Sequence, residues 1–328
     1  MKARLAMRIE SLRSKVRRRL TRRRQPVVPA VAIRDLGEVA PVALPALVDL
    51  PVSKVLALDD FGPLAGWIDL AFPGARAGRP DFPRGREYRK HWEVAMALHA
   101  LAREGHLRPD AEILGIAAGN EPTAFVLTNF VRRVFATDLY LAEGWGESAS
   151  PVMLADPGRH HTGPWHPGRL VVQHMDALDL RYDDATFDAT FSSGSIEHFG
   201  GHEQVRVAMR EAWRVLKPGG LCSVSTEFRL RGPGPGLPGV LMFSADELRE
   251  CVIGSAPWEV VGDLEIPSDD LPTVPYADAL VDGRRHARRH GAVDFDRLEW
   301  SVYPHVALEH DGRVWTSCHL SLRKPVRA

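Results

Sequence analysis

Short apolar runs and stretches of helical periodicity alternate through the middle of the chain. Runs rich in Val, Ile, Leu, Phe and Ala are typical of strands that are buried on both faces of a sheet. They occupy residues 112–117, 134–137, 170–174, 187–192 and 221–226. Helices are predicted around them at residues 86–101, 122–130 and 201–216. Strands that alternate with helices form parallel βαβ units with right-handed crossovers, so the pattern predicts a doubly wound α/β sheet.

The C-terminal third adds a helix and two closing strands. Ser244 is suited to cap a helix, and Glu247 completes a capping box for a helix that runs to Val252. Closing strands are predicted at residues 258–261 and 314–322, and the fold expected is mostly parallel with an antiparallel closing strand. Between the two strands lies an insertion with a basic run that consists of Arg284, Arg285, His286, Arg288, Arg289 and His290.

The N-terminal part of the chain differs in character from the rest. Up to Arg24 there are eleven Lys and Arg residues and one acid. Among them an apolar stripe recurs at intervals of three or four, at Met1, Leu5, Ile9, Leu12, Val16 and Leu20. Residues 1–24 are therefore predicted to be a basic amphipathic tail that contacts an anionic membrane surface or a partner, the alternative being a solvated extension. The prolines of residues 25–84 predict an irregular extension that packs on the main domain.

Composition narrows the class of protein. A hydrophobic content of 45% is normal for a soluble protein with a core. The three cysteines lie far apart, which argues against a zinc site or a disulfide framework and fits a reducing cytoplasm. No run approaches the ~20 apolar residues that span a bilayer, and no secretory signal follows the basic start. Outside the tail, 31 basic residues stand against 41 acidic ones, so nucleic acid is not expected as a partner.

The ends of the predicted strands hold the candidate binding residues, because ligands of a doubly wound sheet bind outside the carboxyl ends of its strands. After the first strand, the small turn at residues 117–119 lets the backbone approach a ligand at a helix N-terminus. Asp138 follows Gly119 by nineteen positions, which suits a carboxylate that accepts hydrogen bonds from both hydroxyls of a ribose. A strand-ending acid is also a common turn former. Asp176 repeats the pattern and could accept from an adenine amino group.

Five segments connect these strand ends in a fixed order. They are ILGIAAGNE (113–121), ATDLY (136–140), HMDALDL (174–180), FDATFSSGSIEHF (187–199) and RVLKPGG (214–220). The series resembles the class I S-adenosylmethionine-dependent methyltransferases, especially the small-molecule branch called type 11, and covers about half of the chain. The resemblance implies a Rossmann-like methyltransferase domain at residues 85–328, with insertions at about 144–168 and 263–300. It also implies S-adenosylmethionine as the cofactor.

The resemblance assigns a role to each strand end. The cofactor-binding residues would be Gly115, Ala117, Gly119, Glu121, Asp138, Leu139, Asp176, Ala177 and Ser193. Ala117 and Gly119 would border the methionine moiety, Asp138 the ribose and Asp176 the adenine, while residues 192–195 would face the methyl-transfer side.

The first segment departs from the family pattern at three positions. Gly115 stands where the family usually has an acid, Ala117 replaces the first glycine, and Glu121 replaces the third. These changes concern the methionine end of the cofactor more than cofactor binding as a whole.

His198 and Glu197 are the candidate catalytic residues. A sulfonium is an excellent leaving group, so such an enzyme chiefly aligns the acceptor and removes its proton. His198 follows the fourth strand, on the rim where the family places acceptor-facing residues, and imidazole titrates near neutral pH. Glu197 is adjacent to it, and Glu227 ends the fifth strand. The alternative is that Glu197 and His198 only start a helix and hold the cofactor turn.

Other groups of residues in the chain do not predict a metal site, a phosphate-binding loop or a catalytic serine. The histidines at positions 160, 161 and 166 have no acid or cysteine at ligand spacing, so no metal site is expected. The chain has neither a phosphate-binding loop sequence nor a nucleophile elbow.

The expected function is methyl transfer from S-adenosylmethionine to an oxygen or nitrogen of a small molecule or glycan. One alternative is a non-catalytic S-adenosylmethionine-binding module, which the altered first turn keeps open. Another is a nicotinamide-dependent oxidoreductase, which the missing G-x-G-x-x-G pattern disfavours. The expected location is the cytoplasm, with peripheral membrane contact through the tail.

Overall fold

The computed structural model describes residues 41–326 except 145–147, 268–269 and 291–297. The chain divides into two units, Met1–Val39 and Ala40–Ala328. The predicted basic tail at 1–24, and residues 25–40 of the predicted extension, lie outside the described residues. All that follows concerns the second unit. Within its described ranges, no helix is long and apolar enough to cross a membrane.

The second unit is built around one mixed sheet with the order β10-β11-β12-β6-β5-β2-β3-β4. Its parallel strands are β2 (Glu112–Ile116), β3 (Arg133–Asp138), β4 (Leu170–His174), β5 (Phe187–Ser193) and β6 (Leu216–Arg231). Next to β6 lies β12 (Arg313–Arg323), which is antiparallel to it and pairs Cys318 with Thr226. The predicted fold class, mostly parallel with an antiparallel closing strand, is confirmed.

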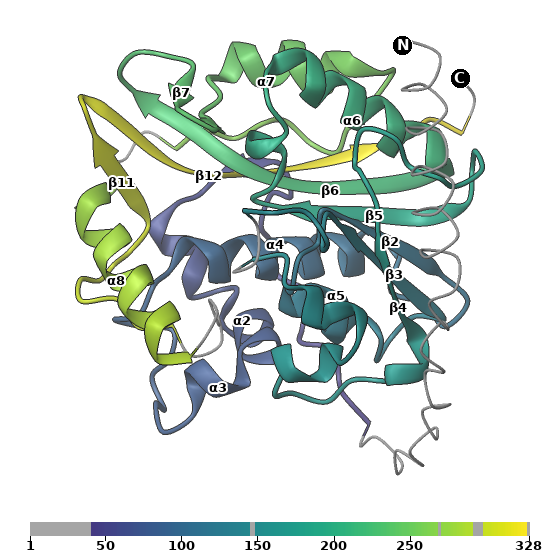
Figure 1. Ribbon diagram of the computed structural model, residues 1–328, viewed down its shortest axis with the longest axis horizontal. Helices are drawn as coiled ribbons and strands as arrows, with labels where there is room; N and C mark the ends of the chain where they lie inside the picture. The colour runs from purple at the N-terminus through teal and green to yellow at the C-terminus, as the bar shows by residue number, and fades with distance from the viewer. Residues whose placement is uncertain (1–40, 145–147, 268–269, 291–297, 327–328) are drawn as a thin grey trace, which may run out of the picture. The chain divides into compact units, whose positions relative to one another are not determined.

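Helices cover both faces of this sheet (Figure 1). One face carries α2 (Ala65–Ala71), α4 (Arg89–Arg103) and α5 (Pro122–Leu127), and the other carries α6 (His202–Val215) and α7 (Ala245–Cys251). Each face has its own apolar core cluster.

Helices α6 and α4 show how burial differs between the faces. Helix α6 is amphipathic, since its buried residues Val205, Ala208, Met209, Ala212 and Val215 form one stripe. In α4, by contrast, every residue from His91 to Leu101 is buried, as expected for a helix that protein surrounds on all sides.

The outer edge of β12 is covered by three short segments in turn. These are β11 (Ala307–His310), β1 (Lys54–Val55) and β9 (Glu259–Val260), all antiparallel to β12. Beyond β11, the edge strand β10 (Thr273–Pro275) runs parallel to it. An unpaired sheet edge exposes backbone donors and acceptors. Because none of the three segments is as long as β12, they share the pairing of its outer edge between them.

The part of the predicted extension that the structure describes is more regular than the sequence analysis expects. It contains β1, the 3-10 helix at Leu58–Phe61, helix α2 and helix α3 (Pro73–Arg76). Elements of two to seven residues are too short to display a period, and the prolines hide the boundaries between them.

Residues 217–220, which lie between the helix predicted to end at residue 216 and the strand predicted to begin at residue 221, form a bulge inside β6. Leu216 pairs with Phe187 and Leu221 pairs with Ala189, so four residues of β6 oppose one residue of β5. Gly219 has φ +82°, a conformation that favours glycine. The Asp188 carboxylate holds the bulge by accepting from Lys217 Nζ at 3.0 Å, Arg108 Nη2 at 2.5 Å and the Glu112 backbone N–H at 2.9 Å.

The predicted loop and insertion also contain regular structure. Residues 148–169 hold three short 3-10 helices, at Pro151–Leu154, Pro157–His160 and Pro167–Arg169. A small hairpin pairs β7 (Gly236–Leu237) with β8 (Val240–Leu241). The basic run lies on α8 (Tyr276–His290), which borders β10 and β11. Single-turn 3-10 helices separate β5 from α6 (Ile196–His198) and follow α7 (Ile253–Ser255).

Candidate functional site

A cavity of about 490 Å³ opens at the carboxyl ends of the parallel strands. The chain order of the sheet reverses between β2 and β5, so this is the topological switch point at which ligands of such sheets bind. Of the eleven predicted site residues, nine line the cavity: Ala117, Gly119, Glu121, Asp138, Leu139, Asp176, Ala177, Ser193 and His198. The other two, Gly115 and Glu197, do not.

The turn after β2 keeps a glycine-like backbone although an alanine occupies it. Ala117 has φ +49° and Gly119 has φ +50°, both in the left-handed region. A side chain at Gly119 would clash, because its Cβ would lie 2.3 Å from the Ser148 carbonyl oxygen. Ser195, which follows β5, stabilises the turn because its Oγ donates a hydrogen bond to the Ala117 carbonyl at 2.8 Å. The loss of the first family glycine therefore leaves the path of the turn unchanged.

Asp138 ends β3 and faces the turn. Its Oδ2 accepts from the Gly119 backbone N–H at 2.8 Å, and its Oδ1 accepts from the Leu139 backbone N–H at 2.6 Å. Burial raises the pKa of this carboxyl, although the two backbone hydrogen bonds oppose the shift. At the end of β4, Asp176 is exposed and accepts from the Leu178 backbone N–H at 2.9 Å.

Gly115 has a packing role in this structure. A Cβ at this position would lie 2.5 Å from the Phe191 ring and 2.7 Å from the Ala118 side chain. The Phe191 ring on the neighbouring strand therefore leaves no room at position 115 for the acid that the family usually has there. Gly115 is not among the described residues that line the cavity, and its contact with the cofactor stays a prediction.

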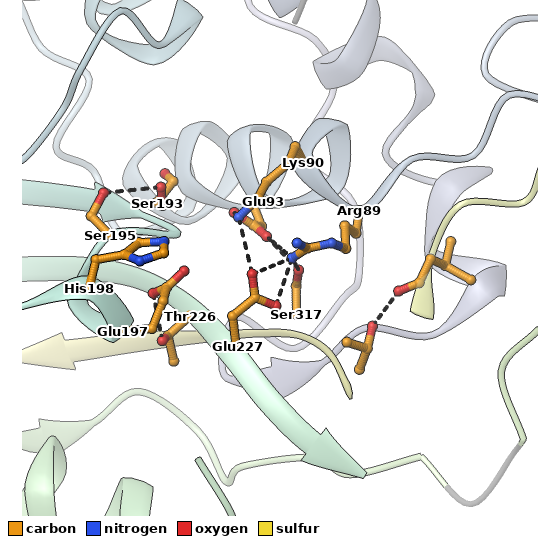
Figure 2. Close-up of polar contacts among 12 residues, drawn as sticks. Arg89, Lys90, Glu93, Ser193, Ser195, Glu197, His198, Thr226, Glu227 and Ser317 are labelled. Atoms are coloured by element: carbon orange, nitrogen blue, oxygen red, sulfur yellow. Dashed lines mark hydrogen bonds and ion pairs between the residues drawn. The ribbon is translucent and has the colours of Figure 1, made fainter. Parts of the chain in front are cut away.

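A charged cluster, defined as Arg89, Lys90, Glu93 and Glu227, borders the cavity where α4 meets β6 (Figure 2). Arg89 Nη1 lies 2.6 and 2.7 Å from the two carboxylate oxygens of Glu227. Lys90 Nζ lies 2.9 Å from Glu93 Oε2 and 3.7 Å from Glu227 Oε1. Ser317 of β12 also donates from its hydroxyl to Glu93. Two cations and two carboxylates thus form one paired network.

The carboxyls in and around this cluster differ in their pKa values. Burial would raise the pKa of Glu227, but Arg89 and Lys90 outweigh it and hold that pKa below its usual value. Burial raises the pKa of Glu197, against the opposing charge of Lys90. It also raises the pKa of Glu121 well above its usual value, with Glu93 adding to the shift. Glu227 is therefore the firmly ionised member of the group.

The two predicted catalytic residues occupy different places. His198 lines the cavity, and its Nδ1 lies 3.0 Å from the Gly239 carbonyl oxygen. A carbonyl only accepts, so Nδ1 carries the proton and Nε2 carries the lone pair. Glu197 is buried behind the cavity wall and accepts from Thr226 Oγ1 at 2.9 Å. Figure 2 shows both side chains beside Ser193 and Ser195.

The sequence analysis missed the charged residues of α4 and the far wall of the cavity. Arg89 and Lys90 lie in the first turn of a helix that is otherwise apolar on all sides, and Glu93 is buried one turn later. Charged side chains in such a helix are rarely buried without partners, and this signal was available in the sequence. No local signal pairs them with Glu227, which lies 138 positions away from Arg89.

The strand-end residues fit the cofactor that the resemblance implies. Each oxygen of Asp138 accepts only one backbone hydrogen bond, which leaves capacity for two ribose hydroxyls. Asn120 Oδ1 is buried and has no hydrogen-bond partner among the described residues, so it can accept from a ligand. Glu121 and Asp138 line the same part of the cavity, where burial raises the pKa of both carboxyls.

The three loop histidines have local structural partners. His160 Nδ1 lies 3.1 Å from Asn120 Nδ2, and the ring of His161 stacks on Phe125 with centroids 5.1 Å apart. His166 donates its backbone N–H to Thr128 Oγ1 at 2.8 Å. Among the described residues, no three His, Cys, Asp or Glu side chains are grouped to hold a metal ion.

Comparisons with known proteins agree with this geometry. Residues 114–224 match the sequence model of the methyltransferase domain family. Among solved structures, the chain is similar to a putative sarcosine dimethylglycine methyltransferase from Galdieria sulphuraria, with 15% identity, 72% of this chain and 85% of that chain covered, and a TM-score of 0.47.

It is also similar to the YcgJ protein from Bacillus subtilis, with 17% identity, coverage of 72% and 99%, and a TM-score of 0.44. A putative methyltransferase from Bacillus halodurans has 16% identity, coverage of 70% and 98%, and a TM-score of 0.43. Residues 114–224 thus match a methyltransferase domain, and this match and the strand order are consistent with a class I methyltransferase, which implies S-adenosylmethionine as the cofactor.

Proposed function

We propose that the chain is an active enzyme that moves a methyl group from S-adenosylmethionine to an oxygen or nitrogen of a small molecule or glycan. One observation carries the proposal. The cavity that begins at the strand ends is also lined by residues of β7, β8, α8, β11 and β12, and the part of the cavity next to these elements is called the second chamber below. A protein that only bound the cofactor would have no use for this additional space.

The cofactor would occupy the half of the cavity at the strand ends. Ala117 and Gly119 would contact the methionine moiety through their backbone, with Glu121 nearby. Asp138 would accept from the ribose hydroxyls, and Leu139 would lie against them. Asp176 and Ala177 would border the adenine, and Ser193 would line the passage to the second chamber.

When bound, S-adenosylmethionine supplies a methyl carbon to which the acceptor's lone pair forms a bond while the electrons of the broken carbon–sulfur bond remain on sulfur. The protein must then take up the acceptor's proton. His198 fills this role best, because it lines the cavity and its hydrogen bond to Gly239 leaves the lone pair on Nε2. Glu197 is the alternative base, but the cavity wall separates it from the chamber.

Calorimetric titration and a transfer assay test this function in two steps. We expect saturable binding of S-adenosylmethionine and none of NAD; the reverse result would favour the oxidoreductase. Transfer of a labelled methyl group to acceptors from a mixed panel of hydroxyl and amine compounds should follow. Tight cofactor binding without transfer to any member of a broad panel would favour the non-catalytic binding module.

A further inference from the structure

The second chamber has an apolar wall, defined as Leu237, Val240, Met242, Tyr276, Leu308 and Trp315. Three of these side chains belong to a separate core cluster and are almost fully buried, with exposed fractions of 1% for Met242, 3% for Leu308 and 2% for Trp315. Side chains packed on their far sides have little freedom to move. The wall therefore presents a fixed apolar surface to whatever enters.

Two aromatic rings give this wall its shape. The rings of Tyr276 and Trp315 lie 5.5 Å apart between centroids, at an interplanar angle of 64°. Tyr276 is the first residue of α8, and Trp315 lies on β12, so elements far apart in sequence build the wall together. Aromatic edges and faces pack well against another ring.

The opposite side of the chamber is polar, and both of its cations are paired, Arg89 with Glu227 and Lys90 with Glu93. An anionic acceptor would have to take one of these cations from its carboxylate, and leaving a buried charge without its partner is strongly unfavourable. Burial raises the pKa of Glu121, a further carboxyl in the cavity lining, well above its usual value, so its neutral form is favoured and it offers a cationic acceptor little attraction. A neutral hydroxyl needs only a hydrogen bond, and the Glu227 carboxylate at the cavity surface can accept one.

We infer that the methyl acceptor is an uncharged, ring-bearing apolar molecule that places a hydroxyl or a non-basic nitrogen against His198 and Glu227. The inference rests on the proposed function, because it names the substrate class of the same cavity. A glycan fits less well. Each of its hydroxyls that loses water against the apolar wall without finding a partner weakens binding.

Binding to the full-length protein saturated with the demethylated cofactor tests the class directly. The probes are 1-naphthol, 1-naphthoate and methyl glucoside, which represent an uncharged ring, a charged ring of similar shape and a sugar. Calorimetry should show that 1-naphthol binds at least about tenfold more tightly than either of the others, a difference of about 1.4 kcal/mol. Equal or tighter binding of 1-naphthoate or of the glucoside would overturn the inference.

A variant on the wall provides the second arm. Val240 lies on β8 and is only partly buried, so Val240→Asp is expected to fold and to weaken 1-naphthol binding at least about tenfold. Its matched control is Leu47→Asp, an exposed apolar position outside the cavity lining, which should leave binding unchanged. Affinity for the demethylated cofactor and the melting temperature, measured on both variants, confirm that they are folded. Undiminished 1-naphthol binding by folded Val240→Asp would contradict the inference.

The two proposals fail in different ways. If 1-naphthol binds as expected but no methyl transfer is found with any acceptor, the substrate class stands and the proposed activity falls. If the labelled methyl group passes to methyl glucoside while 1-naphthol fails to bind, the activity stands and the substrate class falls.

Discussion

Two alanines in this chain adopt a backbone conformation that favours glycine. Ala117, at the cofactor turn, has φ +49°, and Ala185, in the turn before β5, has φ +53°. A left-handed alanine costs about 1–2 kcal/mol relative to the right-handed conformation, whereas a glycine costs about 0.5–1 kcal/mol in lost chain entropy. The turn at Ala117 is therefore maintained by its surroundings, including the hydrogen bond from Ser195.

Ala117→Gly should consequently raise the free energy of unfolding by about 0.5–1 kcal/mol. Urea denaturation measures this change. Ala185→Gly is the matched control, since it relieves the same strain away from the cavity and should stabilise by a similar amount without any effect on cofactor affinity. If Ala117→Gly destabilises the protein while Ala185→Gly stabilises it, the side chain of Ala117 has a packing role that outweighs the strain.

Asp138→Ala should weaken S-adenosylmethionine binding by about 2–3 kcal/mol, the range for hydrogen bonds to a charged group. The carboxylate lies at the cavity surface and retains acceptor capacity for two hydroxyls. Asp176→Ala is the comparison, and a smaller loss is expected because Asp176 is exposed to water. Calorimetric titration measures both affinities. A loss of less than threefold in folded Asp138→Ala would remove the ribose contact from the proposal.

His198→Ala should reduce turnover by about 10²- to 10⁴-fold with little change in cofactor affinity, as expected for a general base. If Glu197 is the base, Glu197→Gln loses turnover and His198→Ala does not. A purely structural histidine would lower the melting temperature and cofactor affinity together, because its bond to Gly239 ties the start of α6 to the β7–β8 hairpin. Measuring all three quantities on both variants separates these outcomes.

The residues that sequence could place are those whose position follows from a strand end. Asp138, Asp176 and Ser193 end or follow short apolar runs, and the carboxyl ends of parallel strands meet at one edge of a sheet. The partners of Arg89 and Lys90 could not be placed in this way. Their pairing with Glu227 depends on how α4 crosses β6, which no local pattern encodes.

Among the elements, the bulge of β6 depends on one buried acid. Asp188 binds Lys217 in the bulge, Arg108 before β2 and the first backbone N–H of β2. The backbone hydrogen bond and the charges of Lys217 and Arg108 outweigh burial and hold the pKa of Asp188 below its usual value. Because the pKa is lowered on folding, this group stabilises the fold above the unfolded pKa, and the stabilisation disappears as pH falls through the folded pKa.

Asp188→Asn should therefore lower the free energy of unfolding by about 1–2 kcal/mol at pH 7, a value reduced by the solvent exposure of Lys217 and Arg108. The difference between the two proteins should shrink as pH falls from about 5 to about 2, where the wild-type carboxyl is protonated as well. Urea unfolding at a series of pH values measures it. A difference that stays constant with pH would mean that the charge of Asp188 contributes nothing.

The predictability of an element depended on its length. Strands β2 to β5 and helix α6 were predicted to within a few residues, since the strands are apolar runs and the helix is long enough to show a period, whereas β6 extends five residues beyond its predicted range at each end. The short strands β1, β10 and β11 contain two to four residues, and tertiary pairing with β12 or with each other determines them. The equally short β9 lies inside the closing strand that was predicted at residues 258–261. The helical nature of α8 was also missed, because the sequence analysis read that segment as an insertion with a basic run.

For the whole molecule, the alternation of strands and helices sufficed to predict the doubly wound sheet and the edge at which ligands bind. It did not predict that residues 54–55 from the N-terminal extension would pair with β12. Nor did it predict that the segment from β7 to β12 would close the second chamber with apolar side chains. The first contact joins segments more than 260 positions apart, and packing alone specifies both.

The remaining prediction concerns the basic tail. All residues that line the cavity lie between Arg89 and Trp315, so deletion of residues 1–24 should leave cofactor affinity unchanged. The eleven basic residues and the apolar stripe of the tail should together bind anionic vesicles. Deletion should therefore abolish most vesicle binding at low salt, as measured by sedimentation with phosphatidylserine-containing vesicles.

A matched variant separates the contributions of charge and apolar stripe. Replacing Leu5, Ile9 and Leu12 with serine keeps every charge of the tail. If the stripe inserts into the bilayer surface, this variant should bind more weakly than the full-length protein, and its residual binding should disappear at high salt, where screening removes the electrostatic contribution. Equal vesicle binding by the full-length and truncated proteins would show that the tail has a different role, and loss of cofactor affinity on truncation would show that the tail contributes to the site.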